Sequence, residues 1–206
     1  MSDHPISLAS QRKQLRQQRR KLTVFQQKQA ERACLSQLIR FRAFQQAQHI
    51  GLYLDAFGEI RTQQIISYCL KHKKKIYLPK ICSMNQRLLW HPISLHQYQA
   101  QRFSRHKLGM LEPMQHRGVA VSKLDLLIMP LLACDSVGMR LGMGGGFYDR
   151  TLATAPQKPF RLGLAHDFQF FPEVFQAQRW DQALDALLCP SKIRSFKRHL
   201  RSTQCL

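Results

Sequence analysis

The sequence predicts an α/β fold: a layered, mostly parallel sheet with helices on both faces, preceded by an N-terminal helical hairpin. Short apolar runs alternate with helix-like segments from residue 49 onward, a pattern typical of parallel sheets. One of these runs, at 124–130, leads into a glycine-rich segment. Leucines also recur seven residues apart before residue 23, as on one face of a helix. We expect the 206 residues to form a single domain, 1–206, with a basic tail from about residue 192.

Two helices are expected before the first strand. Leu8, Leu15 and Leu22 stand among Gln, Arg and Lys, which predicts a helix over residues 8–22 with one narrow apolar face. Thr23 and Gln26 have the spacing of a capping box and predict the start of a second helix. The apolar face of that second helix would consist of Ala30, Cys34, Leu38 and Phe41.

A βαβ unit is expected next. Residues 49–54 predict a strand, a helix follows from about Thr62, and residues 75–79 predict a second strand that Pro79 ends. A strand, a helix and a strand in so short a stretch imply a parallel pair with a right-handed crossover. Further strands are expected at 88–90, 124–130, 161–165 and 184–188, a turn at 109–113, a helix from about Phe147, and a frayed helix or disordered chain in the basic tail.

Composition limits the class of protein. The chain has 32 Lys and Arg against 12 Asp and Glu, so its net charge of +20 favours anionic partners. No apolar run is long enough to cross a membrane, and the N-terminus lacks the apolar segment of a signal peptide, so we expect a soluble, cytoplasmic protein without a membrane partner. Six scattered cysteines and nine histidines form no CxxC or HExxH motif, which argues for free thiols and against a metal site made of nitrogen and sulfur ligands.

The stretch from Gly138 to Leu152, called the glycine segment below, carries the strongest functional signal. Four of its glycines fall within five residues, so the backbone can take positive φ and a ligand can approach it closely. Successive N–H groups in such a loop converge on anions. Arg140 and Asp149 flank the loop, and a cation beside a carboxylate suits a phosphate with Mg²⁺. A tight turn without a ligand is the alternative, and neither the Walker nor the dinucleotide-binding glycine motif matches.

The glycine segment reads GMRLGMGGGFYDRTL and resembles the G-x-R-L-G-x-G-x-G-[YF]-Y-D-R-x-L segment of the 5-formyltetrahydrofolate cyclo-ligases, also called methenyltetrahydrofolate synthetases. Weaker similarities lie at residues 59–62 (E-x-x-T), 111–113 (E-P turn), 125–135 (strand and loop) and 180–185 (closing aspartate motif). The resemblance extends over roughly residues 12 to 190. It implies a reaction in which 5-formyltetrahydrofolate and ATP, with Mg²⁺, give 5,10-methenyltetrahydrofolate, ADP and phosphate.

The resemblance also implies roles for individual residues. Catalysis would rest on Arg140, Tyr148 and Asp149, and the folate would bind at Glu59 and the backbone near Leu54. Mg²⁺ would be held by Asp149 and Asp181, with Asp185 as the alternative to Asp181. ATP would be bound by Arg12, Lys13, Arg16, Arg140, Leu141, Gly142, Met143, Gly144, Gly145, Gly146, Phe147 and Tyr148.

Two other classes of protein remain open at this stage. The charge of +20 favours a nucleic-acid-binding protein, but the basic runs are not interleaved with aromatic residues and no nucleic-acid-binding signature is present, so no specific nucleic acid is expected. A sugar-phosphate or CoA-handling enzyme is the second, because the same layered fold supports many functions. ATP and a folate that can carry a polyglutamate tail are themselves polyanions, so a positive charge also suits an enzyme that binds them. We expect this enzyme to be a monomer; the sequence leaves open whether these substrates use all of the charge.

Overall fold

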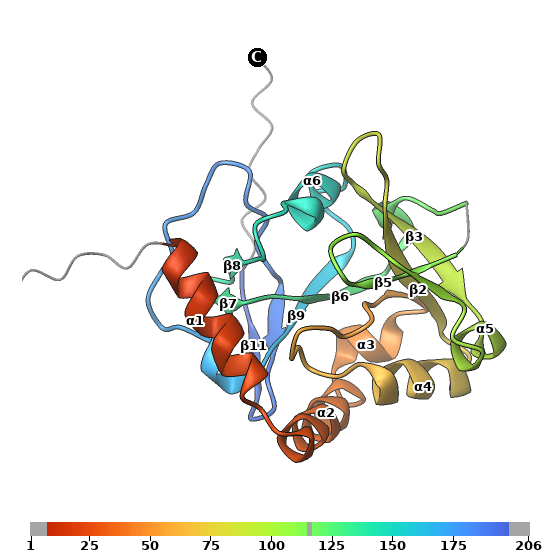
Figure 1. Ribbon diagram of the computed structural model, residues 1–206, viewed down its shortest axis with the longest axis horizontal. Helices are drawn as coiled ribbons and strands as arrows, with labels where there is room; N and C mark the ends of the chain where they lie inside the picture. The colour runs from red at the N-terminus through yellow and green to blue at the C-terminus, as the bar shows by residue number, and fades with distance from the viewer. Residues whose placement is uncertain (1–7, 115–116, 198–206) are drawn as a thin grey trace, which may run out of the picture.

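The computed structural model describes residues 8–114 and 117–197 and has a mixed α/β fold (Figure 1). Its helices are α1 (Leu8–Arg20), α2 (Val24–Leu38), α3 (Arg42–Gln46), α4 (Gln63–Lys71), α5 (Leu95–Gln99) and α6 (Phe147–Leu152), with short 3₁₀ helices η1 (Val121–Lys123) and η2 (Asp167–Gln169). Its strands are β1 (His49–Gly51), β2 (Lys75–Ile81), β3 (Leu88–Ile93), β4 (Phe103–Arg105), β5 (Leu111–Pro113), β6 (Leu126–Pro130), β7 (Ala133–Cys134), β8 (Arg140–Leu141), β9 (Phe160–Leu164), β10 (Ala186–Leu188) and β11 (Ile193–Ser195).

The main sheet has the strand order β11-β10-β9-β6-β1-β2-β3. The five strands from β10 to β2 are parallel, whereas β11 and β3 add to the two edges in antiparallel orientation. β1 and β2 form the parallel pair that the sequence predicts, with α4 as the crossover between them. Two small antiparallel pairs, β4-β5 and β7-β8, lie outside this sheet.

Both faces of the sheet are covered, as alternation along β6 illustrates. Leu126 and Ile128 belong to the apolar core beneath α2, α3 and α4, whereas Leu127 and Met129 belong to a second core that includes Leu152 of α6. Figure 1 shows α2, α3 and α4 together on one side of the sheet and α6 on the other. Helices on both faces of a mostly parallel sheet confirm the predicted fold class.

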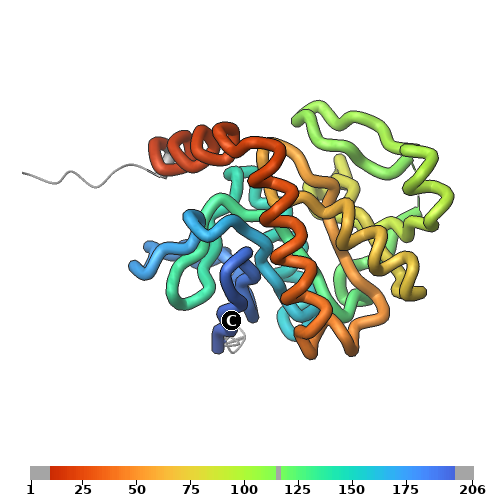
Figure 2. The backbone as a smooth tube through the Cα atoms, turned by 90° about the horizontal axis from the view of Figure 1, so that it is seen from below, coloured from red at the N-terminus to blue at the C-terminus, as the bar shows by residue number. Residues whose placement is uncertain are grey.

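The first two helices follow one another as predicted but do not pack side by side. Thr23 and Gln26 form the predicted capping box at the start of α2. Figure 2 shows α1 and α2 at a wide angle to each other, with α1 reaching away from the helical layer. Leu15 is buried in a separate small cluster with Leu132 and Ala133, next to the glycine segment. The apolar face of α1 therefore packs next to the glycine segment and not against α2.

Several predicted boundaries differ from the structure. The second helix ends at Leu38, and Phe41 precedes α3. β1 ends at Gly51, and the predicted turn at 109–113 includes strand β5. Pro79 does not end β2, which continues to Ile81. The backbone of Tyr77 faces β1, so that of Pro79 does too, and because β1 ends opposite Tyr77 the missing N–H of proline costs no bond in the sheet.

The prediction for the start of the basic tail is wrong. Residues 193–195 were expected to be frayed or disordered, but they form β11, which pairs with β10 at an edge of the main sheet. The guanidinium of Arg194 lies 4.0 Å from the centre of the Phe170 ring, so one of the tail's charges is held against an aromatic face. Residues 198–206 of the predicted tail lie outside the described residues. Among the helices that the structure describes, none is long and apolar enough to span a membrane.

Candidate functional site

The glycine segment begins at a turn that a buried carboxylate holds. Asp135 accepts hydrogen bonds from the backbone N–H groups of Val137 (3.0 Å), Met139 (2.7 Å) and Phe175 (2.8 Å). These bonds fix the connection between β7 and β8, and thereby the place from which Arg140 projects.

Two glycines give the segment a backbone that other residues adopt only with strain. Gly144 has φ of +101°, and Gly146, the residue before α6, has φ of +63°. A Cβ atom on Gly144 would meet no heavy atom within 4 Å, so the space beside its backbone is open. The positive φ accounts for glycine at this position, and the open space leaves room for a ligand to approach the backbone. A backbone of this kind meets the geometric requirements of an anion cradle.

Helix α1 lies against the segment and brings basic side chains to it. Arg12 donates a hydrogen bond from Nε to the carbonyl oxygen of Gly142 at 3.1 Å. One turn further on, Arg16 is half-buried, whereas Lys13 is exposed. The structure thus joins Arg12 to the predicted ATP-binding segment, although 130 positions separate it from Gly142.

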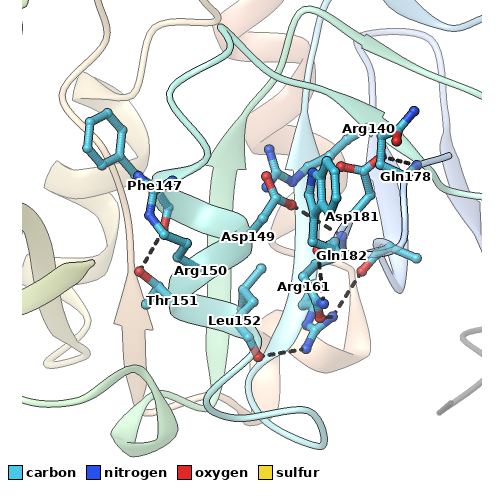
Figure 3. Close-up of polar contacts among 12 residues, drawn as sticks. Arg140, Phe147, Asp149, Arg150, Thr151, Leu152, Arg161, Gln178, Asp181 and Gln182 are labelled. Carbon is cyan, nitrogen blue, oxygen red and sulfur yellow. Dashed lines mark hydrogen bonds and ion pairs between the residues drawn. The ribbon is translucent and has the colours of Figure 1, made fainter. Parts of the chain in front are cut away.

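Arg140 and Asp149 form a close ion pair, with 2.7 Å between Nη2 and Oδ1 (Figure 3). The same oxygen of Asp149 accepts the backbone N–H of Gln182 at 3.2 Å. The Arg140 guanidinium also lies 5.5 Å from the centre of the Tyr148 ring. Burial raises the pKa of the Tyr148 hydroxyl above its ordinary value, and the nearby Glu59 adds to the rise, so this hydroxyl stays protonated and can donate a hydrogen bond.

The two candidates for a second metal ligand differ in environment. Asp181 precedes Gln182, and its Oδ2 accepts the backbone N–H of Gln178 at 2.7 Å (Figure 3). Asp185 instead binds the backbone N–H of Arg161 at 2.8 Å and so ties β9 to the segment before β10. This structural task favours Asp181 over Asp185 as a metal ligand. The described residues contain no group of three or more His, Cys, Asp or Glu that could hold a metal by themselves.

The predicted folate side lies at the carboxyl end of β1. Leu54 is half-buried there, and Glu59 follows in the next loop. Oε2 of Glu59 accepts the backbone N–H of Ala56 at 3.1 Å, and Oε1 lies 3.7 Å from Nη1 of Arg19. Burial raises the pKa of the Glu59 carboxyl to about 7, although Arg19 and the Ala56 N–H oppose the rise. Glu59 is thus a buried acceptor that is close to titration at neutral pH.

Comparisons with known proteins identify the family of this chain. The model of the 5-formyltetrahydrofolate cyclo-ligase family matches residues 7–190. The 5-formyltetrahydrofolate cyclo-ligase of Escherichia coli (strain K12) is 35% identical over 188 residues, covering 87% of this chain and 98% of that protein. The chain belongs to the 5-formyltetrahydrofolate cyclo-ligase family.

Other members of the cyclo-ligase family extend the comparison. The Haemophilus influenzae 5-formyltetrahydrofolate cyclo-ligase is 34% identical over 186 residues, which cover 86% of this chain and 94% of that protein. The NMR structure of Aquifex aeolicus 5,10-methenyltetrahydrofolate synthetase matches with a TM-score of 0.78 at 25% identity and covers 97% of this chain and 95% of that one. The resemblance found in the sequence is confirmed, and the protein is a ligase of this family.

Within this cyclo-ligase, several predicted site residues make contacts that the sequence does not reveal. Leu141 packs in the cluster of Leu15, and Met143 is half-exposed. The carbonyl oxygen of Gly145 accepts a bond from Nη2 of Arg150 at 2.6 Å. The guanidinium of Arg150 also lies 5.3 Å from the centre of the Phe147 ring. Arg150, which is not among the predicted site residues, thus contacts the loop at two points.

Sequence reasoning missed three polar residues that the fold buries between the two halves of the candidate site. Arg19 is almost fully enclosed, His166 is the residue before η2, and Gln169 is the last residue of η2. Nε2 of His166 lies 3.2 Å from the carbonyl oxygen of Gly58, and burial lowers the pKa of His166 to about 4. The side-chain amide of Gln169 donates to the carbonyl oxygens of Leu131 (2.8 Å) and Leu132 (2.9 Å). Arg19 had one signal: it lies four residues after Leu15 and therefore on the apolar face of α1.

Proposed function

We propose that the protein converts 5-formyltetrahydrofolate to 5,10-methenyltetrahydrofolate with consumption of ATP and release of ADP and phosphate. The observation that carries the proposal is the open, positive-φ backbone at Gly144, flanked by Arg12 and by the Arg140–Asp149 pair. Family membership supports the folate substrate. The open backbone supports a triphosphate as the second substrate, since a glycine loop can offer its N–H groups to an anion and basic side chains flank this one.

The chemistry follows from a poor leaving group. In 5-formyltetrahydrofolate the formyl oxygen cannot leave as hydroxide when N10 closes the ring. If that oxygen attacks the γ-phosphorus, the bond to ADP breaks and an iminium phosphate forms. The N10 lone pair then adds to the formyl carbon, the carbon–oxygen bond breaks, phosphate leaves with the oxygen, and the N10 proton passes to solvent. Positioning and charge neutralisation are the main tasks of the protein in such a transfer.

We assign these tasks to residues as follows. The backbone from Gly142 to Gly146 would hold the β- and γ-phosphates. Arg140 would neutralise charge that develops on the transferred group, while its pairing with Asp149 fixes its direction. The protonated hydroxyl of Tyr148 would donate a hydrogen bond to a phosphate oxygen. Glu59 would accept hydrogen bonds from the N–H groups of the pterin ring, next to the backbone of Leu54.

Asp149 and Asp181 fit Mg²⁺ because this ion usually takes one or two carboxylates together with phosphate oxygens and water. Both protein contacts of Asp149 use Oδ1, and among the described residues Oδ2 accepts no hydrogen bond. Mg²⁺ would bind at that oxygen and supply further neutralisation of phosphate charge. A protein cage of three ligands is not required for such a site.

The test is direct. We expect the absorbance of methenyltetrahydrofolate to appear only when ATP and 5-formyltetrahydrofolate are both supplied, and its absence under these conditions would contradict the proposal. With the formyl oxygen labelled by heavy oxygen, about one labelled atom per turnover should appear in inorganic phosphate. Labelled water beside unlabelled phosphate would exclude phosphorylation of the formyl group.

We also propose that the protein is a monomer of the cytoplasm and that its positive charge attracts the polyglutamate tail of the folate. Folates with longer tails should then bind more tightly, and added salt should weaken this gain in affinity.

A further inference from the structure

Arg19 is a charged residue in a position where charge is costly. Its side chain is only 1% exposed, and burial lowers the pKa of its guanidinium while Glu59 opposes that effect. Nη1 lies 3.4 Å from the carbonyl oxygen of Leu131 and 3.7 Å from Oε1 of Glu59. Nη2 lies 3.8 Å from Sδ of Met143, in the glycine segment. A residue enclosed in this way has a task inside the protein, because a leucine or methionine would fill the same space without the cost of desolvation.

The loop that carries Glu59 packs closely against Arg19. Phe57 and Gly58 both have positive φ, at 52° and 77°. A Cβ atom on Gly58 would lie 2.6 Å from the carbonyl oxygen of Arg19, so the loop approaches the backbone of α1 as closely as glycine allows. Arg19 therefore contacts the loop through its backbone and the Glu59 carboxylate through its side chain.

The groups around Glu59 come from four parts of the chain, and Arg19 differs from the others in its positive charge. The Asp55 carboxylate, four residues before Glu59, favours the protonated form of Glu59. The hydroxyls of Tyr53 and of Tyr148 in α6 are neutral, because burial raises their pKa. His166, the residue before η2, contacts the Gly58 carbonyl and is neutral at pH 7, because burial, helped by the charge of Arg19, lowers its pKa to about 4. Arg19 is the positive charge in this set. It opposes the burial that otherwise favours a protonated Glu59.

We propose that Arg19 is a positioning residue for the folate substrate: from inside the protein it holds the Glu59 carboxylate in place and favours its ionised form, which accepts hydrogen bonds from the pterin ring. The proposal rests on the function proposed above, since Glu59 is assigned there to the pterin. Arg19, only 1% exposed, does not contact the substrate itself. Its effect on folate binding passes through the charge and the place of Glu59.

The experiment compares Arg19→Met, Arg19→Lys and the matched control Arg20→Met, which changes an exposed arginine on the same helix. For each variant, kcat and KM for 5-formyltetrahydrofolate are measured from pH 6 to pH 9 at saturating ATP. In Arg19→Met the midpoint of the kcat/KM profile should move upward by roughly one pH unit or more, since a neighbouring cation shifts a carboxyl by about that amount. At pH 7 the loss should lie in KM, about tenfold, and should shrink at pH 9, where Glu59 is ionised again. Arg20→Met should keep the wild-type profile.

Arg19→Lys keeps the argument testable if Arg19→Met does not fold. A lysine retains the charge but lacks the fork that reaches Glu59, Leu131 and Met143 together, so its midpoint should lie between the other two. A loss of activity that is equal at every pH, or a lysine variant as impaired as the methionine variant, would overturn the proposal.

A second measurement does not depend on catalysis. The Glu59 carboxyl carbon is followed by ¹³C NMR in glutamate-labelled protein, with Glu59→Gln identifying its resonance. The titration midpoint should rise from wild type to Arg19→Lys to Arg19→Met. If it rises and no folate activity exists in the wild type, the proposed function fails while the electrostatic role of Arg19 stands. If it stays constant, the inference on Arg19 is wrong whatever the activity.

Discussion

The two halves of the candidate site are built in different ways. The glycine segment is one continuous stretch in which Arg140 and Asp149, nine residues apart, already face each other. The folate side is assembled from distant parts of the chain: Arg19 comes from α1, Glu59 from the loop after β1, and His166 from the start of η2. Local sequence and backbone geometry determine the first half, whereas burial determines the electrostatics of the second. The two halves should therefore respond differently to substitution and to pH.

The largest effect is expected on the glycine-segment side. Asp149→Asn keeps the size of the side chain and an oxygen for the Gln182 N–H but removes the negative charge. We expect kcat to fall by roughly a hundred- to a thousandfold, the usual loss when one group that stabilises transition-state charge is removed. Some loss of thermal stability is expected as well, because the Arg140 guanidinium, only 4% exposed, would lose its ion-pair partner. Steady-state kinetics across a Mg²⁺ titration measure the loss, and near-normal turnover at limiting Mg²⁺ would remove Asp149 from the metal site.

The same assay distinguishes the two candidates for the second ligand. Asp181→Asn should raise the Mg²⁺ concentration needed for half-maximal activity and leave the melting temperature unchanged. Asp185→Asn should do the reverse, because the Asp185 carboxylate holds the Arg161 N–H between two parts of the sheet. If Asp185→Asn alone shifted the Mg²⁺ dependence, the assignment to Asp181 would be wrong.

On the folate side, two buried groups should make the free energy of unfolding depend on pH, and their contributions change with pH in opposite directions. The pKa of Glu59 is raised from 4.5 to about 7, so the folded protein keeps a proton that the unfolded chain releases, and stability falls as pH rises through that range. The pKa of His166 is lowered from 6.5 to about 4, so the unfolded chain takes up a proton first, and stability falls as pH drops through that range. The two slopes oppose each other where the ranges overlap.

Single substitutions should separate them. Glu59→Gln leaves the His166 slope, and the free energy of unfolding should rise by about 3 kcal/mol from pH 4 to pH 6.5. His166→Gln leaves the Glu59 slope, and the free energy should fall by about 3 kcal/mol from pH 4.5 to pH 7. Urea denaturation at a series of pH values measures both. Profiles that coincide with the wild type in both variants would mean that neither group is titrated as described.

The same contrast explains what could be predicted from the sequence. The buried strand β6, the glycine segment and the start of α6 follow from contiguous patterns of apolar residues and glycines. Arg19 was missed because a charged residue on a helix is usually at the surface, and only the packing of the loop around Gly58 and of η2 encloses it. β11 was missed because a short basic stretch carries little strand signal of its own, and its pairing depends on the edge that β10 offers. The roles predicted for individual site residues stay predictions.

A smaller effect is expected from the backbone of the glycine segment. Gly144→Val introduces a β-branched residue at φ of +101°, with strain of about 1–3 kcal/mol, which corresponds to a rise of roughly 5- to 150-fold in KM for ATP. The KM for folate should stay within about threefold of the wild type, because no atom near Gly144 transmits the change by contact. Gly144→Ala, which meets no neighbour, separates backbone strain from obstruction of the ligand. Equal losses for both substrates, with a lower melting temperature, would favour a purely structural turn.

The smallest effects should come from α1, and they separate two basic residues that stand next to each other in the sequence. Arg12 contacts the Gly142 carbonyl, so Arg12→Gln should raise the KM for ATP by about tenfold, the loss of one charge-assisted contact. Lys13 is exposed, so Lys13→Gln should change it by no more than about twofold, in line with the weak energies of exposed charges. The Arg12 effect should persist at 0.5 M salt, because a half-buried contact is screened less than an exposed one. If both substitutions had the same effect, and salt abolished both, α1 would act on ATP only through its overall charge, and the contact between Arg12 and the glycine segment would have no part in binding.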